Sequence, residues 1–173
     1  MAYNIGKISI SVAGESHSPA LSVILTGIES GVEIDKLELL KFMQRRAPGK
    51  DAISTSRNEA DVPVILSGIS GGITEGSPIS AIIENNNTRS SDYGDSLDLI
   101  RPGHADYPAS VKFKGTFDHR GGGQFSGRLT APLCFAGAIA KQVLSKKGIE
   151  VNAHISSIMG ICDESYKEEI KDV

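Results

Sequence analysis

The length, composition and charge of this chain limit what it can be. Its 173 residues are 39% hydrophobic and 23% charged, which suffices for the buried core of one domain spanning residues 1–173. The net charge of −3 and the pI near 5.8 argue against a broad basic surface for nucleic acid or anionic membranes. Any phosphate-binding site must therefore be local.

Nothing in the sequence directs the chain to a membrane or out of the cell. The uncharged stretch 62–74 is shorter than the roughly 18 residues that span a bilayer. The first residues lack the basic and apolar segments of a secretory signal. Cys134 and Cys162 lie in apolar stretches, which favours buried free thiols over a disulfide or a metal pair. These features predict a cytoplasmic protein.

The amino-terminal part of the chain predicts strands. Ile8, Ile10 and Val12 alternate with serines, which is the period-two pattern of a strand with one buried face. A β-branched run at residues 21–26, bounded by proline and glycine, predicts a second strand.

Residues 35–46 change to helical periodicity. Asp35 is a typical N-cap, and Glu38, three residues later, is its expected capping partner. Pro48-Gly49 ends the predicted helix near Arg46. The residues expected to face the core are Leu37, Leu40 and Met43, and the expected hydrophobic staple joins Ile34 to Leu39.

After this helix, short apolar runs at residues 63–67 and 79–83 predict two more strands. A second helix is expected from Thr130 to Lys147, with Thr130 as its cap. Because residues 129–140 carry no charge, this helix is expected to be buried and central. Strands mixed with helices, without strict alternation, favour an α+β fold.

Two histidines lie in short polar stretches that contain glycine, Gly14-Glu15-Ser16-His17 and Arg101-Pro102-Gly103-His104-Ala105-Asp106. Each supplies a group that titrates near neutral pH beside an acid, which is typical of proton-transfer sites. A structural role is the alternative, and it is favoured for His119 and His154. The spacing of the four histidines does not indicate a metal site.

The densest polar segment, residues 118–128, precedes the second helix and places Gly121-Gly122-Gly123 between Arg120 and Arg128. Consecutive glycines let the main chain approach a ligand closely, and helix starts attract anions, so the pattern predicts a phosphate site. A flexible turn with solvated arginines is the alternative. The glycine spacing fits neither the dinucleotide motif nor the P-loop. Arg45-Arg46 fits either an anion site or a favourable contact with the helix dipole.

A set of short motifs follows one another along nearly the whole chain. They are Gly14-Glu15-Ser16-His17, Arg45-Arg46-Ala47-Pro48-Gly49, Glu59-Ala60-Asp61 with Ile65-Leu66-Ser67-Gly68, Ser91-Asp92-Tyr93, Arg101 to Asp106, Arg120 to Gly123, and Ala136 to Lys141. In this order and spacing they closely resemble the chorismate synthase family.

The resemblance implies a lyase of the shikimate pathway, which leads to the aromatic amino acids. The implied reaction converts 5-enolpyruvylshikimate 3-phosphate to chorismate and phosphate by an anti-1,4-elimination that needs reduced FMN without net redox change. Family members differ in whether they reduce the flavin themselves with NADPH. The implied fold is a β-α-β sandwich with antiparallel sheets around long central helices, assembled as a homotetramer.

The resemblance also implies residue roles. His17 matches the histidine thought to protonate the departing phosphate, and His104 matches the one thought to protonate reduced flavin. An acid near a phosphate leaving group lowers the barrier to its departure, which agrees with the first role. The matching substrate-binding positions are Ser16, Arg46, Arg101, Ser126 and Arg128. The matching FMN-binding positions are Gln124, Phe125, Ser126, Arg46 and His104.

The chain departs from the family pattern at the start of the second helix. Gln124-Phe125-Ser126 stands where the family commonly has Arg-Ser-Ser, and Gly127-Arg128-Leu129-Thr130 replaces Ala-Arg-Glu-Thr. We interpret this as a variant that still binds FMN. Ala52 stands where many members carry a further arginine, for which Arg57 is a candidate substitute.

Family chains are about twice as long, so the resemblance implies an amino-terminal portion from which the carboxyl half is absent. Because that half supplies further flavin and substrate contacts in the family, residues 1–173 alone are expected to be inactive. Two alternatives are a non-catalytic module that binds phosphate or flavin, and a fragment whose helix at residues 130–147 serves only oligomer contacts.

Overall fold

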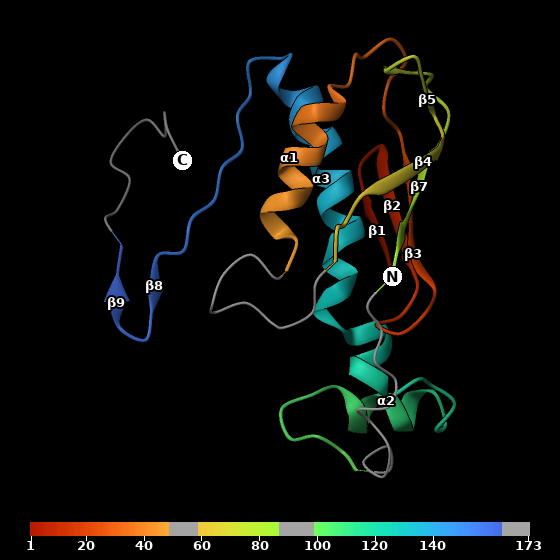
Figure 1. The fold of residues 1–173 in the computed structure, drawn as a ribbon, viewed down its shortest axis with the longest axis vertical. Helices are drawn as coiled ribbons and strands as arrows, with labels where there is room; N and C mark the ends of the chain where they lie inside the picture. The colour runs from red at the N-terminus through yellow and green to blue at the C-terminus, as the bar shows by residue number, and fades with distance from the viewer. Residues whose placement is uncertain (49–58, 87–98, 164–173) are drawn as a thin grey trace.

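A five-stranded antiparallel sheet forms one side of the molecule (Figure 1). The computed structural model describes residues 1–48, 59–86 and 99–163. The sheet order is β1-β2-β3-β7-β4, with bounds Ala2–Ile5, Ile8–Ala13, Ala20–Thr26, Ile79–Glu84 and Pro63–Ser67. The four strands predicted from the sequence are therefore confirmed, and β1 adds a fifth.

The sheet buries one of its faces. Leu21, Val23 and Leu25 of β3 alternate with more accessible residues and are at most 1% exposed. Val12 on β2 lies opposite Val23 and is also buried, as the alternation predicts. This face packs against a helix, whereas the outer face carries the exposed Ile24 of β3.

Helix α1 spans Lys36–Arg46, and its cap is only partly as expected. Asp35 is the N-cap, and its Oδ1 accepts hydrogen bonds from the amides of Leu37 at 2.7 Å and Glu38 at 3.1 Å. The expected return bond from Glu38 is replaced, because the Asp35 amide donates to Oε1 of Gln142 at 2.7 Å. Nε2 of Gln142 in turn donates to the Asp35 carbonyl at 3.0 Å. A helix distant in the sequence thus completes the cap.

The buried stripe of α1 is also rotated from the predicted one. Leu39 and Met43 are buried and four residues apart, so they share a face of the helix. Leu37, two residues before Leu39, points away and is 69% exposed, while Leu40 is half-buried. The expected stripe was wrong at Leu37 because α1 turns the Leu39 face toward the core.

Helix α3 spans Thr130–Ser145 and lies between the sheet and α1, as its uncharged sequence predicts (Figure 1). Thr130 does not cap it, because the Thr130 hydroxyl donates to the carbonyl of Gly127 at 2.6 Å. The helix ends two residues before the predicted Lys147, and Gly148 follows with a φ of +72°. The order of layers is therefore sheet, α3, α1.

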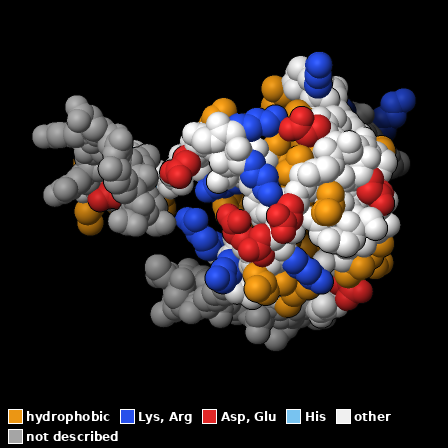
Figure 2. Space-filling view, turned by 90° about the horizontal axis from the view of Figure 1, so that it is seen from above, with side chains coloured by type: hydrophobic (Ala, Val, Ile, Leu, Met, Phe, Trp, Pro, Cys, Tyr) orange, Lys and Arg blue, Asp and Glu red, His pale blue; other side chains and the backbone are white. Residues whose placement is uncertain are grey.

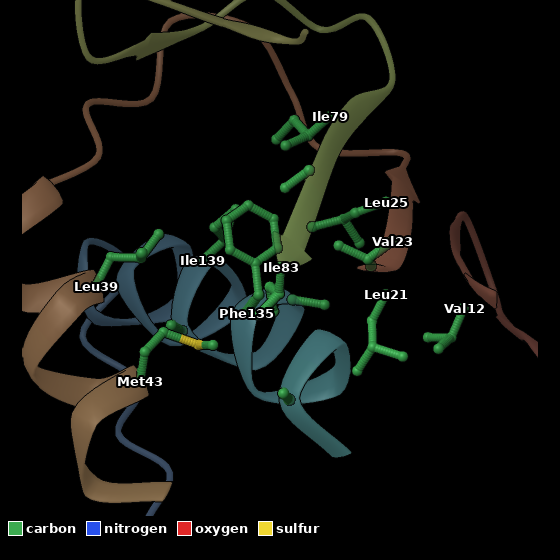
Figure 3. Close-up of a cluster of buried hydrophobic side chains, with 14 of the residues drawn as sticks. Val12, Leu21, Val23, Leu25, Leu39, Met43, Ile79, Ile83, Phe135 and Ile139 are labelled. Carbon is green, nitrogen blue, oxygen red and sulfur yellow. The ribbon is translucent and has the colours of Figure 1, made fainter. Parts of the chain in front are cut away.

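One apolar cluster joins the three layers (Figure 3). Phe135 and Ile139 of α3 are fully buried at its centre. Around them lie side chains from α1 and the sheet: Leu39, Met43, Val12, Leu21, Val23, Leu25, Ile79 and Ile83. The structure is thus an α+β fold with antiparallel strands, as predicted.

A groove of about 530 Å³ lies between α1 and α3. Phe42 of α1 and Gly137 of α3 line it, together with Cys134, which is only half-buried. Burial raises the pKa of the Cys134 thiol above its usual value. Cys162 is exposed, which corrects the prediction that both thiols are buried; it lies on β9, outside the main core.

The remaining elements are short and were not predicted. They are β5 Ile69–Ser70, β6 Ile73–Thr74, α2 Asp106–Lys112, β8 Ser157–Ile158 and β9 Ile161–Cys162. The β8-β9 hairpin lies apart from the three layers, and α2 lies near the start of α3 (Figure 1). Across the described ranges, we find no helix with the length and apolar character needed to cross a bilayer.

The end of the molecule at which α3 finishes carries both signs of charge. Nζ of Lys147 lies 2.8 Å from a Glu29 oxygen, and Nζ of Lys146 lies 3.8 Å from Glu33. In the view onto this end, acidic and basic side chains are interspersed over the described surface (Figure 2). Exposed pairs of this kind contribute little to stability.

Candidate active site

The triple glycine forms a turn with non-helical backbone inside the 3₁₀ segment Arg120–Phe125. Gly121, Gly122 and Gly123 have φ values of +58°, +94° and +52°, a conformation that side chains other than glycine rarely adopt. A Cβ on Gly123 would lie 2.1 Å from the carbonyl oxygen of Asp118. The sequence therefore folds here only because all three residues are glycine.

The loop that carries His17 lies directly against this turn. The amide of Ser16 donates to the carbonyl of Gly123 at 3.1 Å. A Cβ on Gly121 would lie 2.5 Å from Oγ of Ser16 and 2.6 Å from Cε1 of His17. A side chain at residue 121 would therefore collide with Ser16 and the imidazole of His17, and glycine avoids this collision.

The second predicted histidine meets the next glycine of the same turn. A Cβ on Gly122 would lie 3.0 Å from Nε2 of His104. The two histidines are 87 positions apart in the printed numbering, yet they contact successive residues of one turn. The structure therefore brings His17, His104 and the glycine-rich segment into one site, which the sequence treats as separate motifs.

Asp106 holds His104 and Arg101 together. Nδ1 of His104 lies 2.7 Å from Oδ1 of Asp106. Arg101 donates to the same carboxylate from Nη2 at 2.7 Å, from Nε at 2.7 Å and from its amide at 3.0 Å. These Arg101 bonds, with a smaller contribution from His104, hold the pKa of Asp106 well below its usual range, so its carboxylate is ionised.

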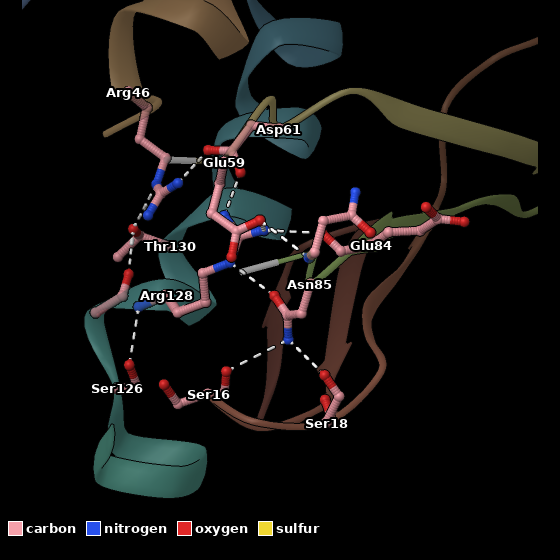
Figure 4. Close-up of polar contacts among 12 residues, drawn as sticks. Ser16, Ser18, Arg46, Glu59, Asp61, Glu84, Asn85, Ser126, Arg128 and Thr130 are labelled. Atoms are coloured by element: carbon pink, nitrogen blue, oxygen red, sulfur yellow. Dashed lines mark hydrogen bonds and ion pairs between the residues drawn. The ribbon is translucent and has the colours of Figure 1, made fainter. Parts of the chain in front are cut away.

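A second, buried cluster of charges lies beside the turn (Figure 4). The Asp61 carboxylate is fully buried and forms ion pairs with Arg46, at the end of α1, and with Arg128, just before α3. Nε of Arg128 also donates to Oδ1 of Asn85 at 2.8 Å, and its Nη2 donates to the carbonyl of Glu84 at 3.1 Å. The Arg128 side chain is only 3% exposed.

Asn85 links this cluster to the His17 loop (Figure 4). Its Nδ2 donates to the carbonyl oxygens of Ser18 at 2.7 Å, Glu15 at 3.3 Å and Ser16 at 3.5 Å. Because Oδ1 of the same side chain accepts from Arg128, one buried amide connects the start of α3 to the loop. The position of the His17 loop therefore depends on the buried charges.

The remaining predicted site residues lie around the same turn. Oγ of Ser126 accepts the amide of Arg128 at 3.2 Å. Nε of Arg46 donates to Oγ1 of Thr130 at 3.1 Å. Gln124 is half-buried, and Phe125 is 41% exposed with its ring centroid 6.4 Å from that of Phe113. Direct contact of any of these groups with a ligand stays a prediction.

Two exposed guanidinium groups flank the histidines. The side chains of Arg101 and Arg120 are 41% and 40% exposed, in contrast with Arg128. Arg120 is paired with Asp118, whose pKa is lowered mainly by the hydrogen bonds that Arg120 donates. Both guanidinium groups are therefore partly accessible to a dissolved anion.

Sequence patterns left three residues of the site without a role: Asp61, Asn85 and Asp106. Asp61 and Asp106 both belong to motifs named in the sequence analysis, and the arginine in the Asp106 motif is a signal that a counter-ion is needed there. Asn85 directly follows β7, and the end of this strand is its signal in the sequence. Ala52, Arg57 and Ser91-Asp92-Tyr93, together with Gly49, lie outside the described residues.

The sequence was compared with known families and proteins. The family model described as chorismate synthase matches residues 8–172. The chain belongs to the chorismate synthase family. A chorismate synthase of Pyrococcus abyssi is 48% identical over 151 residues, which are 87% of this chain and 42% of that protein. One of Lancefieldella parvula is 44% identical over 92% of this chain and 42% of its own length.

A solved structure supports the same assignment. A crystal structure of chorismate synthase matches with a TM-score of 0.61 and 28% identity, covering 85% of this chain and 36% of that one. The antiparallel α+β architecture is thus that of a chorismate synthase. The chain spans about two fifths of the length of the curated chorismate synthases that it matches.

Proposed function

We propose that this chain supplies one part of a chorismate synthase active site, in an enzyme that forms chorismate and phosphate from 5-enolpyruvylshikimate 3-phosphate. The observation that carries the proposal is the meeting of His17 and His104 against Gly121 and Gly122. Two imidazoles beside one main-chain turn give two proton donors to a single ligand site. Family membership supports the reaction.

The two histidines have separate tasks in this proposal. His17 donates a proton to the departing 3-phosphate, because a protonated phosphate is the better leaving group. His104, beside Gly122, would hold a proton for the reduced flavin. Arg101 and Arg120 are the accessible guanidinium groups and attract the anionic substrate. Arg46, Ser16 and Ser126 complete its surroundings, while the buried Arg128 contributes through Asp61 and Asn85.

The turn also fits an FMN-binding surface. The exposed Phe125, at the end of the turn, offers a flat ring an aromatic neighbour. Gln124, Phe125, Ser126, Arg46 and His104 are the residues that would hold the cofactor. Reduced FMN supplies the electron-rich ring that the elimination requires, without net redox change.

Alanine substitutions test the roles of the histidines. In a chorismate synthase of family length that carries these residues, His17→Ala and His104→Ala should each lower kcat by about 100-fold or more, the usual contribution of general acid–base groups. His154→Ala, at an exposed histidine whose Nδ1 lies 3.5 Å from Asp163, is the matched control. Unchanged turnover in both site variants would favour a non-catalytic phosphate- or flavin-binding module.

We further propose that residues 1–173 alone neither bind FMN tightly nor turn over substrate, because the chain spans about two fifths of its relatives. Titration of the purified chain with FMN should leave the flavin spectrum unshifted, and a tight shifted complex would contradict this. The mass of the intact natural protein gives its true length.

Assembly and reductant are separate parts of the proposal. We place the enzyme in the cytoplasm as a homotetramer, and light scattering of the family-length protein measures that state. A form that self-associates without turnover would favour the oligomerisation alternative. Turnover with NADPH as the sole reductant would assign flavin reduction to the enzyme itself.

A further inference from the structure

The contacts of His104 constrain where its protons lie. Nδ1 faces Oδ1 of Asp106 at 2.7 Å, and the Asp106 side chain is only 3% exposed. The carboxylate also accepts three hydrogen bonds from Arg101, so it is held in place as an ionised acceptor. An ionised carboxylate has no proton to donate, and the nitrogen that faces it must therefore carry one.

One competing contact favours the opposite tautomer. Nη2 of Arg101 lies 3.4 Å from Nδ1 of His104 and would donate to that nitrogen if it were unprotonated. The same Nη2 already donates to Oδ1 of Asp106 at the shorter distance of 2.7 Å. Because charge-assisted hydrogen bonds strengthen at short distance, the bond between His104 and Asp106 prevails.

The other ring nitrogen points into the site. A Cβ on Gly122 would lie 3.0 Å from Nε2 and 3.3 Å from Cε1 of His104, so Nε2 lies against the main chain of this glycine, in a side chain that is 30% exposed. Nδ1 is turned away toward the buried carboxylate. The ring thus has one nitrogen committed to the protein and one directed toward the turn.

We propose that Asp106 is a positioning residue, which keeps the proton of neutral His104 on Nδ1 and makes Nε2 the atom through which His104 releases or accepts a proton. The catalytic meaning of this assignment rests on the proposed function. When charged His104 gives up a proton from Nε2, the electron pair stays on Nε2, and Asp106 remains ionised throughout.

Nitrogen NMR of the histidine rings tests the assignment without any activity. The 173-residue chain is labelled with ¹⁵N and measured near pH 8, above the ordinary imidazole pKa of roughly 6.5. The His104 ring is assigned through its own bonds to the assigned main chain, and the loss of its signals in His104→Gln checks that assignment. We expect the shift of a protonated nitrogen at Nδ1 and that of an unprotonated nitrogen at Nε2. The reverse pattern in the unmodified chain would overturn the proposal, even if no variant folds.

Asp106→Asn provides the second arm. The oxygen of the introduced side-chain amide is expected to stay with the main-chain amide and Nε of Arg101, which turns the introduced NH₂ group toward Nδ1 and reverses the tautomer. Asp163→Asn, which makes the same change beside His154 at 3.5 Å, should leave the His104 signals unchanged. A folded Asp106→Asn chain with unaltered His104 signals would also contradict the proposal.

Kinetics separate this assignment from the proposed function. In the family-length enzyme, Asp106→Asn should lower kcat by about 10- to 100-fold, the range for residues that orient a functional histidine, while KM changes little. If the tautomer is as assigned but His104→Ala retains full turnover, the catalytic role of His104 fails while the role of Asp106 stands.

Discussion

Asp61 is the carboxylate shared by Arg46 and the buried Arg128. It is fully buried, pairs with both Arg46 and Arg128, and has a φ of +49°, which is uncommon for a residue other than glycine. Surrounding structure must hold such a conformation in place. Here two guanidinium groups, one at the end of α1 and one just before α3, donate hydrogen bonds to the Asp61 carboxylate and hold it in place.

Removing the charge of Asp61 should therefore destabilise the fold. Asp61→Asn removes the nearer of two carboxylates beside the buried Arg128, the other being that of Glu59 at 3.9 Å, and we expect a loss of about 3 kcal/mol in the free energy of unfolding. Glu29→Gln, at the exposed pair with Lys147, removes the same charge and should cost about 0.5 kcal/mol or less. Urea denaturation measures both, and equal losses would contradict the structural role of Asp61.

Gly121 is the second residue with a sharply defined requirement. Gly121→Ala places a Cβ in left-handed backbone and against Ser16 and His17, whereas Gly115→Ala meets the same type of backbone, with a φ of +76°, in open space. We expect the control to lose about 1 kcal/mol of stability from the backbone alone. Gly121→Ala should lose at least about twice that and shift the NMR signals of His17. Equal losses and an unmoved His17 would show that the contact is unimportant.

At the scale of elements, the orientation of α1 is the clearest departure from the predicted structure. The period and start of the helix were readable, because both are local properties of residues 35–46. Its orientation depends on α3, which supplies Gln142 to the cap and Phe135 and Ile139 to the core. The periodicity of residues 35–46 does not indicate where α3 lies, so Leu37 was assigned to the wrong face of α1.

Alanine substitutions distinguish the two orientations of α1. Leu39→Ala empties a site that is 2% exposed and should cost about 3 kcal/mol. Leu37→Ala removes the same atoms from a side chain that is 69% exposed and should change stability by about 0.5 kcal/mol or less. Thermal or urea unfolding of the two variants gives the comparison, and a larger loss at Leu37 would restore the predicted stripe.

At the scale of the whole molecule, paired carboxylates make stability depend on acidity. Asp106 and Asp118 both have a pKa lowered in the folded state by hydrogen bonds from a neighbouring arginine. A lowered folded pKa contributes stability above the unfolded value of roughly 3.9, and this contribution is lost as the pH falls below it. The free energy of unfolding should thus be steady near neutral pH and fall below about pH 4.

Asp106→Asn isolates one part of this dependence. The variant should be less stable than the unmodified chain at pH 7. The difference should narrow as the pH falls below about 4, because Asp106 of the unmodified chain then binds a proton when the chain unfolds, whereas the introduced asparagine does not. Asp163→Asn, at an exposed carboxylate, is the control with a nearly constant difference. Urea denaturation at pH 3 to 7 supplies the curves, and a difference for Asp106→Asn that stays constant would contradict its lowered pKa.

The sequence predicts the separate motifs of the site but not their convergence, which depends on the fold of the whole molecule. The motifs around His17, His104 and the triple glycine were visible, because each is a short run of unusual residues. Their convergence was not, since it requires the antiparallel pairing of β2, β3 and β7 and the reach of Asn85 across to the His17 loop. The buried thiol predicted at Cys162 was wrong for a related reason, because the β8-β9 hairpin has no part in the core.

The centre of this site is the main chain of the triple-glycine turn, and side chains such as those of His17 and His104 surround it. Substitution of any one of these three glycines by another residue introduces backbone strain or a steric collision, so the turn itself tolerates little change. We expect selectivity for ligands to change instead at Gln124 and at the exposed Phe125, the last two residues of the 3₁₀ segment. A library confined to these two positions would explore ligand preference while leaving both histidines in place.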